Sequence, residues 1–298
     1  MEIVYIPSEK NNIVLIGDGI KKTVISNNRS FASGFPISSS ATLNIDGPNF
    51  IAMNLTVQNT AGAEGKQAVA LRSNSPNSAF YLLEIKGYQD TLYIHNGPQF
   101  YRECTIFGTV DFIFGEGPAF FQKCQILARQ ALPPQENALT ANGRLTPTSG
   151  DGFAFQLCNI TGDEDLLNSK NPTPTFLGRP WKAYSRTVFL QSYMSSIINS
   201  QGWLRWNTTY ESTLFYAEFK NQGAGAVVNK RVNWPGVHST LDIRMAEQYT
   251  VIEVHWDIDI MTEDVGAKME EKTSDEKLSG DYDDYRSDDE QVDGEADP

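Results

Sequence analysis

The amino-acid sequence predicts an all-β protein folded as a parallel β-helix, a solenoid of short stacked coils, and three observations support this prediction. The first is a weak repeat, in which a phenylalanine opens a short segment of alternating apolar and polar residues. The second is a shared spacing, because Cys104 and Cys124 lie 20 residues apart and Asp90 and Asp111 lie 21 residues apart. The third is composition, since 23 glycines and 14 prolines provide the many turns of a β-rich chain.

The repeated segments are each too short to bury an apolar face alone, so they must stack on their neighbours. Stacked strands lie about 4.8 Å apart, which brings side chains of like type into ladders inside the solenoid. Cys104, Cys124 and Cys158 fit inward-facing rungs of such a ladder, and a disulfide or a metal site are the alternatives. The repeated segments start at Phe50, Phe80, Phe100, Phe120 and Phe153.

The sequence divides into a solenoid with an incomplete first coil, residues 1–250, and a tail, residues 251–298. The tail is densely acidic and has no apolar periodicity, so we expect it to be disordered. Segments of the solenoid where the alternation weakens are expected to be long loops, namely 127–150 and 161–175. The β pattern resumes after them, at 176–191, 201–206 and 213–219.

Most of the net charge of −13 belongs to residues 263–298, where 15 acidic and 4 basic residues contribute −11 and leave −2 for the rest of the chain. No basic patch stands out, which argues against a nucleic-acid partner. There is no run of about 18 apolar residues, which argues against a membrane span, and the first residues lack the pattern of a signal peptide. Four N-x-S/T triplets are candidate glycosylation sites in a secreted chain, at Asn28, Asn54, Asn159 and Asn207.

Asp90 and Asp111 are the main candidates for chemistry, because each stands among aromatic and β-branched residues and a buried carboxylate is costly. One coil apart, they are expected to face the same side, where one pKa rises and the other falls to give an acid and a nucleophile or base. Gln67 and Gln89 could add amide N–H groups as an oxyanion hole, and Arg179 could hold one carboxylate by a bidentate bond. Each residue also has a purely structural interpretation, as a turn cap, a ladder amide or an ion-pair partner.

A set of aromatic residues could line a groove for sugar rings, although aromatic residues more often belong to the core. They are Tyr93, Phe114, Trp181, Trp203 and Trp206. The nucleophile motif of most serine hydrolases, G-x-S-x-G, is absent. His95, His238 and His255 are scattered and form no ligand motif, so no metal site is expected. These residues alone do not distinguish an esterase from a glycosidase or a lyase.

Seven short motifs follow one another along the chain: GDGIKKTVI at 17–25, QNTAG at 58–62, QAVALR at 67–72, GYQDTLY at 87–93, FGTVDFIFG at 107–115, LGRPW at 177–181 and GWLRW at 202–206. Together they resemble the plant pectin methylesterases (pectinesterases) from about residue 11 to residue 250. The resemblance implies a right-handed parallel β-helix that hydrolyses methyl esters of homogalacturonan, releasing methanol and leaving acidic pectin. It implies no metal or organic cofactor.

The resemblance also assigns roles through these motifs. Asp111 would be the nucleophile that attacks the ester carbonyl, and Asp90 the acid that protonates departing methanol and then the base that activates water. Gln67 and Gln89 would form the oxyanion hole, and Arg179 would orient Asp111. The polymer would be contacted by Arg179, Phe80, Tyr93, Phe114, Trp181 and Trp203.

The family further implies a secreted glycoprotein of the plant cell wall, a monomer active in pectin catabolism and cell wall modification, with a proteinaceous pectinesterase inhibitor as a partner. Two departures stand against the family pattern: its mature domain begins earlier, and residues 252–298 replace its usual terminal segment. A catalytically inactive homologue that binds pectin is therefore one alternative. Another β-helix enzyme of pectin, a polygalacturonase or a lyase, is the second.

Overall fold

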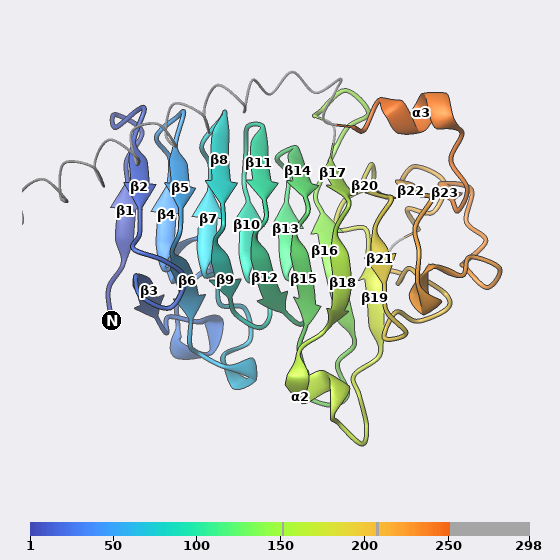
Figure 1. Ribbon diagram of the computed structural model, residues 1–298, viewed down its shortest axis with the longest axis horizontal. Helices are drawn as coiled ribbons and strands as arrows, with labels where there is room; N and C mark the ends of the chain where they lie inside the picture. Colours follow the sequence, from blue (N-terminus) through green and yellow to red (C-terminus); the bar gives the residue numbers. More distant parts are fainter. Residues whose placement is uncertain (151, 207–208, 251–298) are drawn as a thin grey trace, which may run out of the picture. The chain divides into compact units, whose positions relative to one another are not determined.

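The computed structural model describes residues 1–150, 152–206 and 209–250, all of which belong to one unit, Met1–Val254. Three parallel sheets run along this unit, and the chain visits them in turn before it returns to the first sheet one position further along (Figure 1). Parallel strands of one sheet are joined by right-handed crossovers. The predicted right-handed parallel β-helix is confirmed.

Short strands build all three sheets, and strands that are neighbours within a sheet are hydrogen-bonded to one another. The first sheet contains β1 (Val4–Ile6), β4 (Leu43–Ile45), β7 (Leu71–Ser73), β10 (Leu92–Ile94), β13 (Ile113–Gly115), β16 (Asn137–Asn142) and β19 (Thr175–Gly178). The second contains β2 (Val14–Ile16), β5 (Ile51–Met53), β8 (Ser78–Tyr81), β11 (Gln99–Arg102), β14 (Ala119–Gln122), β17 (Phe153–Gln156), β20 (Arg186–Leu190), β22 (Phe215–Phe219) and β23 (Val237–His238). The third contains β21 (Tyr193–Met194), β18 (Asn159–Gly162), β15 (Gln125–Ala128), β12 (Thr105–Gly108), β9 (Glu84–Lys86), β6 (Thr56–Asn59) and β3 (Val24–Asn27).

Helical segments are short and lie between the strands. The α-helices are α1 (Ile37–Ser40), α2 (Glu164–Leu167) and α3 (Ile243–Glu247), and the 3₁₀ segments are η1 (Phe31–Ser33), η2 (Ala63–Gly65) and η3 (Ala224–Ala226). Among the described residues, no helix has the length and apolar character needed to cross a bilayer.

An aromatic ladder fills the interior of the solenoid. Its rungs are Phe80, Tyr101, Phe121, Phe155 and Phe189, one from each of five successive strands of the second sheet. Neighbouring rings are stacked, with centroids 4.4 to 4.8 Å apart, an arrangement that adds to the stabilisation gained by burying each ring. The repeated phenylalanine of the sequence therefore marks the strands whose side chains form this core.

The three cysteines form a second ladder beside the aromatic one. Cys104, Cys124 and Cys158 are free thiols, and all three are buried. Each Sγ lies 3.3 to 3.6 Å from a backbone carbonyl oxygen of the preceding coil. The prediction that they are inward-facing core thiols is confirmed, and the alternative of a disulfide is wrong.

Two segments that were expected to be loops contain regular structure. Strand β16 lies within 127–150 and buries all six of its residues. Its polar members, among them Asn137, bond the backbone inside the solenoid, with Asn137 Nδ2 donating to the carbonyl oxygen of Arg129 at 2.8 Å. A strand with polar side chains turned inward has no apolar alternation to detect. Helix α2 lies within 161–175. In contrast, 201–206 forms only an isolated bridge between Trp203 and Gly178.

Some predictions fall outside the described residues. These are the disorder of the acidic tail at 251–298, the glycosylation triplet at Asn207 and the placement of His255. Of the other triplets, Asn54 lies in the turn between β5 and β6 with a left-handed φ of 56°, and Asn159 opens β18.

Candidate active site

Asp90 and Asp111 occupy equivalent positions on adjacent coils, each two residues before a strand of the first sheet. The strands β10 and β13 pair in register, with Leu92 opposite Ile113. Both aspartates have a left-handed backbone, with φ of 62° and 51°, a conformation that aspartate tolerates better than most residues. The two carboxyl groups therefore face the same side, as the 21-residue spacing predicts.

The turns that carry the two aspartates begin at glycines that have no room for a side chain. A β carbon on Gly87 would lie 2.6 Å from Oγ1 of Thr91. A β carbon on Gly108 would overlap the β carbon of Phe112. In both coils the chain closes tightly over the residue that follows the aspartate, so the two turns have the same compact form.

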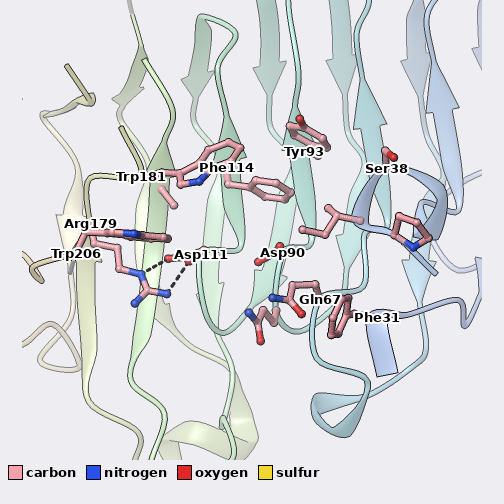
Figure 2. Close-up of a pocket in the computed structure, with 14 residues that line it drawn as sticks. Phe31, Ser38, Gln67, Asp90, Tyr93, Asp111, Phe114, Arg179, Trp181 and Trp206 are labelled. Atoms are coloured by element: carbon pink, nitrogen blue, oxygen red, sulfur yellow. Dashed lines mark hydrogen bonds and ion pairs between the residues drawn. The ribbon is translucent and has the colours of Figure 1, made fainter. Parts of the chain in front are cut away.

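Arg179 binds one of the two carboxylates with both arms of its guanidinium. It follows β19, and its Nε and Nη2 atoms donate to Oδ1 and Oδ2 of Asp111, both at 2.7 Å. The guanidinium also lies over the ring of Trp206, 4.4 Å from its centroid. A planar fork between a carboxylate and an aromatic ring holds Asp111 in one orientation (Figure 2).

Burial raises the pKa of both carboxyl groups, each of which is 6% exposed. The pKa of Asp90 lies well above its usual range, because the negative charge of Asp111 reinforces the effect of burial. For Asp111, burial also raises the pKa, but the hydrogen bonds and charge of Arg179 oppose that rise. The expectation that one pKa would fall is wrong, because desolvation dominates at this depth. Asp90 is nevertheless the carboxyl group that holds its proton more strongly.

Gln67 and Gln89 stand beside the aspartates on two successive coils. Gln67 follows η2 and a left-handed Lys66 with φ of 58°, and Gln89 directly precedes Asp90. The backbone joins the two glutamine segments, since the N–H of Ala68 donates to the carbonyl oxygen of Gln89 at 3.1 Å. Both glutamines line the same pocket as the aspartates.

The pocket has a volume of about 670 Å³ and an aromatic floor. The rings of Tyr93 and Phe114 are stacked with centroids 4.5 Å apart, and Trp181 meets Phe114 edge-on at 6.1 Å. Trp206 and Arg179 lie at one end of the pocket, and Phe31 and Ser38 lie at the other (Figure 2). The site thus combines two carboxyl groups, two amides and one guanidinium over a flat apolar surface of the kind that sugar rings cover.

The family model described as Pectinesterase matches residues 1–256 of this chain. This chain belongs to the pectinesterase family. A pectinesterase/pectinesterase inhibitor from Prunus persica, PPE8B, is 52% identical over 254 residues, which cover 85% of this chain and 49% of the relative. The chain therefore spans about half the length of that curated relative.

Solved structures of pectin methylesterases have the same fold as this chain. The enzyme from carrot is 40% identical, with a TM-score of 0.83 over 87% of this chain and 82% of its own. A variant pectin methylesterase in complex with a hexasaccharide is 27% identical, with a TM-score of 0.71 over 86% of this chain and 85% of its own.

Two aromatic residues that were expected to contact the polymer lie in the core of the solenoid. Phe80 is fully buried and is stacked on Tyr101 in the aromatic ladder. Trp203 is 1% exposed and is stacked on Tyr216, with ring centroids 4.0 Å apart. Side chains enclosed in the solenoid do not reach a ligand outside it, so these two assignments are wrong.

The segment between β3 and β4 supplies pocket residues that the sequence analysis missed. They are Phe31, Pro36, Ile37 and Ser38. The backbone N–H of Phe31 donates to the carbonyl oxygen of Gln67 at 2.8 Å, and its side chain is 54% exposed. Two phenylalanines, Phe31 and Phe35, in a polar segment without strand alternation were the available signal. Trp206 was considered for a groove and does line the pocket, beside Arg179.

No group of three or more metal-ligating side chains gathers anywhere in residues 1–150, 152–206 and 209–250. His95 lies against Tyr93 and shares a hydrogen bond of 3.0 Å between its Nδ1 and Oδ1 of Asn74. His238 lies against Phe215. The pocket that contains Asp90 and Asp111 has no histidine or cysteine among its described lining residues.

Proposed function

We propose that this chain is a pectin methylesterase, which hydrolyses the methyl esters of homogalacturonan to acidic pectin and methanol. The observation that carries the proposal is the asymmetric carboxyl pair, in which Arg179 holds Asp111 by two bonds of 2.7 Å while burial keeps the pKa of Asp90 high. An oriented carboxylate beside a protonated carboxyl group supplies the nucleophile and the acid of a covalent ester hydrolysis.

In the first half-reaction an oxygen of the Asp111 carboxylate attacks the carbonyl carbon of the ester, and the carbonyl oxygen becomes an oxyanion. The amide N–H groups of Gln67 and Gln89, which line the same pocket, donate to this oxyanion. The tetrahedral intermediate collapses with cleavage of the bond to the methoxy oxygen. Asp90 transfers its proton to that oxygen, so methanol leaves and an acyl anhydride with Asp111 remains.

In the second half-reaction Asp90, now ionised, takes a proton from water. The hydroxide forms a bond to the acyl carbon, and the same amides stabilise the second oxyanion. Collapse breaks the bond to Asp111 and returns its carboxylate to Arg179. One water is consumed, one methanol and one free carboxyl group are formed, and Asp90 is again protonated.

The aromatic floor and the two ends of the pocket suit a linear chain of sugar rings. Tyr93, Phe114 and Trp181 offer flat apolar faces, and Phe31 and Trp206 flank the carboxyl groups from opposite ends. The similar enzyme in complex with a hexasaccharide supports an oligosaccharide of several rings as the ligand. Methyl-esterified homogalacturonan is the substrate that we assign to this pocket.

The setting that we propose is the plant cell wall, in which a secreted glycoprotein acts as a monomer on pectin. The peach relative carries both pectinesterase and pectinesterase inhibitor in its name. On that basis we include a proteinaceous inhibitor among the partners.

Methanol release from highly methylated pectin, measured beside the Asp111→Asn variant, tests the reaction and the nucleophile together. The parent is expected to release methanol without shortening the polymer and without an unsaturated product. The variant is expected to lose activity by about 10⁴-fold or more, as enzymes do when a covalent nucleophile is removed, and to retain pectin binding.

Other outcomes point elsewhere. Chain shortening by the parent would indicate a polygalacturonase, and an unsaturated product would indicate a lyase. A folded parent that binds pectin but releases no methanol would indicate an inactive homologue. Activity of the Asp111→Asn variant at the level of the parent would contradict the mechanism.

A further inference from the structure

Arg129 stands behind the turn that carries Gln89 and Asp90, although it belongs to a coil two turns further along the chain. It directly follows β15, and the strand register places it in line with Thr109 and Tyr88 of the two preceding coils. Its backbone is fixed, because its N–H donates to the carbonyl oxygen of Gly108 at 2.8 Å. Its side chain points back across one whole coil.

The guanidinium of Arg129 contacts the turn in two ways. It lies over the ring of Tyr88, 3.9 Å from the centroid, and its Nη1 donates to the carbonyl oxygen of Gly87 at 3.1 Å. On the other side its Nε donates to Oδ2 of Asp163 at 3.2 Å. Asp163 is itself fixed, because its Oδ1 accepts from the backbone N–H of Leu166 at the start of α2.

The contacts of Arg129 add to hydrogen bonds that already hold Tyr88, the residue before Gln89. The carbonyl oxygen of Tyr88 already accepts from the N–H of Thr109 at 2.9 Å and from Oγ1 of Thr91 at 3.0 Å. Arg129 adds a restraint on the ring of Tyr88 and on the preceding peptide. The backbone that leads into Gln89 is thereby held on both sides.

We propose that Arg129 is a positioning residue for the esterase reaction, acting through the Gly87–Tyr88 segment to hold the amide of Gln89 at the oxyanion. This inference rests on the function proposed above. Arg129 does not line the pocket, so it does not contact the substrate. Oxyanion donors act only at short range, so a displaced amide lowers kcat and leaves substrate binding nearly unchanged.

A double-mutant cycle tests whether Arg129 acts through Gln89. The variants are Arg129→Ala, Gln89→Ala and their combination. Arg102→Ala is the matched control, because Arg102 is the last residue of β11 in the second sheet and forms an ion pair with the next residue, Glu103. Arg129→Ala is expected to lower kcat about tenfold, a fraction of the loss that follows removal of a whole oxyanion donor. The KM of Arg129→Ala and the kcat of the Arg102→Ala control are both expected to stay within about twofold of the parental values. In the Gln89→Ala background the Arg129→Ala change is expected to lower kcat by less than about twofold, because coupled residues are not additive.

Hydrogen exchange of the peptide spanning 87–91 provides a readout independent of activity, and it is expected to speed up in Arg129→Ala and to stay at the parental rate in Arg102→Ala. Arg129→Lys serves for the cycle if the alanine variant does not fold. Parental kcat in the variant, an equal tenfold loss in both backgrounds, or unchanged exchange would each overturn the inference. If the parent folds but releases no methanol, and exchange is still faster in Arg129→Ala, the proposed reaction is contradicted. The conclusion that Arg129 holds the turn would still stand.

Discussion

The two turns that present Asp90 and Asp111 have one backbone form and two chemical environments. Both begin at a glycine closed against the residue after the aspartate, and both place the aspartate in the left-handed region. Only Asp111 receives the bidentate bond of Arg179. Burial and the charge of Asp111 raise the pKa of Asp90, while the same arginine limits the rise at Asp111.

The difference between the turns shows where a repeat protein acquires asymmetry. The coil itself supplies two copies of the same carboxyl position, which alone would give a symmetric pair. Specialisation comes from a side chain that arrives from another coil, since Arg179 lies 68 residues after Asp111 in the chain. The repeat places the two carboxyl groups in equivalent positions, and Arg179 makes them chemically different by binding only Asp111.

Replacing the arginine is the strongest way to break this difference. Without the guanidinium the Asp111 carboxylate is no longer held in one orientation, and a misplaced reacting group can cost about 10²-fold in rate, so we expect Arg179→Met to lower kcat/KM by about 10²-fold or more. Without the guanidinium the pKa of Asp111 rises further, so the low-pH limb of the kcat/KM profile moves to higher pH. Methanol release measured across pH checks both changes.

Arg205→Met provides the control for that substitution, because Arg205 forms an exposed ion pair with Glu211 and its side chain is 71% exposed. The control is expected to keep the parental rate and pH profile. An Arg179→Met enzyme with an unshifted low-pH limb would show that the arginine does not set the ionisation of Asp111.

The pairing of the aspartates could be predicted from sequence because it depends on spacing alone. A period of 21 residues in a stacked solenoid places Asp90 and Asp111 side by side without knowledge of any other contact. The same logic correctly predicted the cysteine ladder. It does not account for the burial of Phe80, because the strand register aligns Phe80 with Tyr101 and not with Phe100, so the predicted repeat frame is off by one residue at that strand.

Contacts between residues of distant coils could not be derived from the repeat spacing of the sequence. The position of Phe31 depends on a loop that closes on Gln67, and nothing in the spacing of the sequence fixes where that loop folds. Strand β16 was missed because its inward residues are polar, so its burial leaves no apolar alternation. A bidentate bond from Arg179 to one carboxylate was considered from the residues alone, but its assignment to Asp111 came from the resemblance of motifs. The two bonds themselves follow from the structure.

The glycines at the start of the two turns offer a second contrast, this time in stability. Overpacking a tight site costs about 1–3 kcal/mol, and Gly108→Ala is expected to lie at the upper end of that range because its β carbon would meet the β carbon of Phe112. Gly87→Ala is expected to cost less, since its β carbon would lie 2.6 Å from Oγ1 of Thr91, a less severe overlap than the one at Gly108. Urea unfolding of the two variants and the parent gives the comparison, and a larger cost for Gly87→Ala would show that the turns are not packed in this way.

The smallest effect that we predict is a change in melting temperature at pH 8, which has opposite signs for Asp90→Asn and Asp111→Asn. A buried carboxyl group whose pKa is raised stabilises the fold fully below its unfolded pKa, and this contribution is lost as pH rises through the folded pKa. Asp90→Asn removes the group that resists ionisation, so its melting temperature should exceed that of the parent at pH 8, by about 2–4 °C for each 1 kcal/mol. The excess should shrink as pH falls and vanish below about pH 4, near the unfolded pKa of aspartate.

Asp111→Asn should instead lower the melting temperature at pH 8, because it takes from Arg179 both of its charge-assisted bonds and leaves the guanidinium partly buried without its partner. Thermal unfolding of both variants at pH 8, 6 and 4 measures the two signs on one scale. Equal shifts at the two positions would mean that the arginine does not distinguish the turns. A gain in Asp90→Asn and a loss in Asp111→Asn at pH 8, with the loss persisting at pH 4 because the pKa of Asp111 is also raised, would place the asymmetry of the site in the pairing of one carboxylate with Arg179.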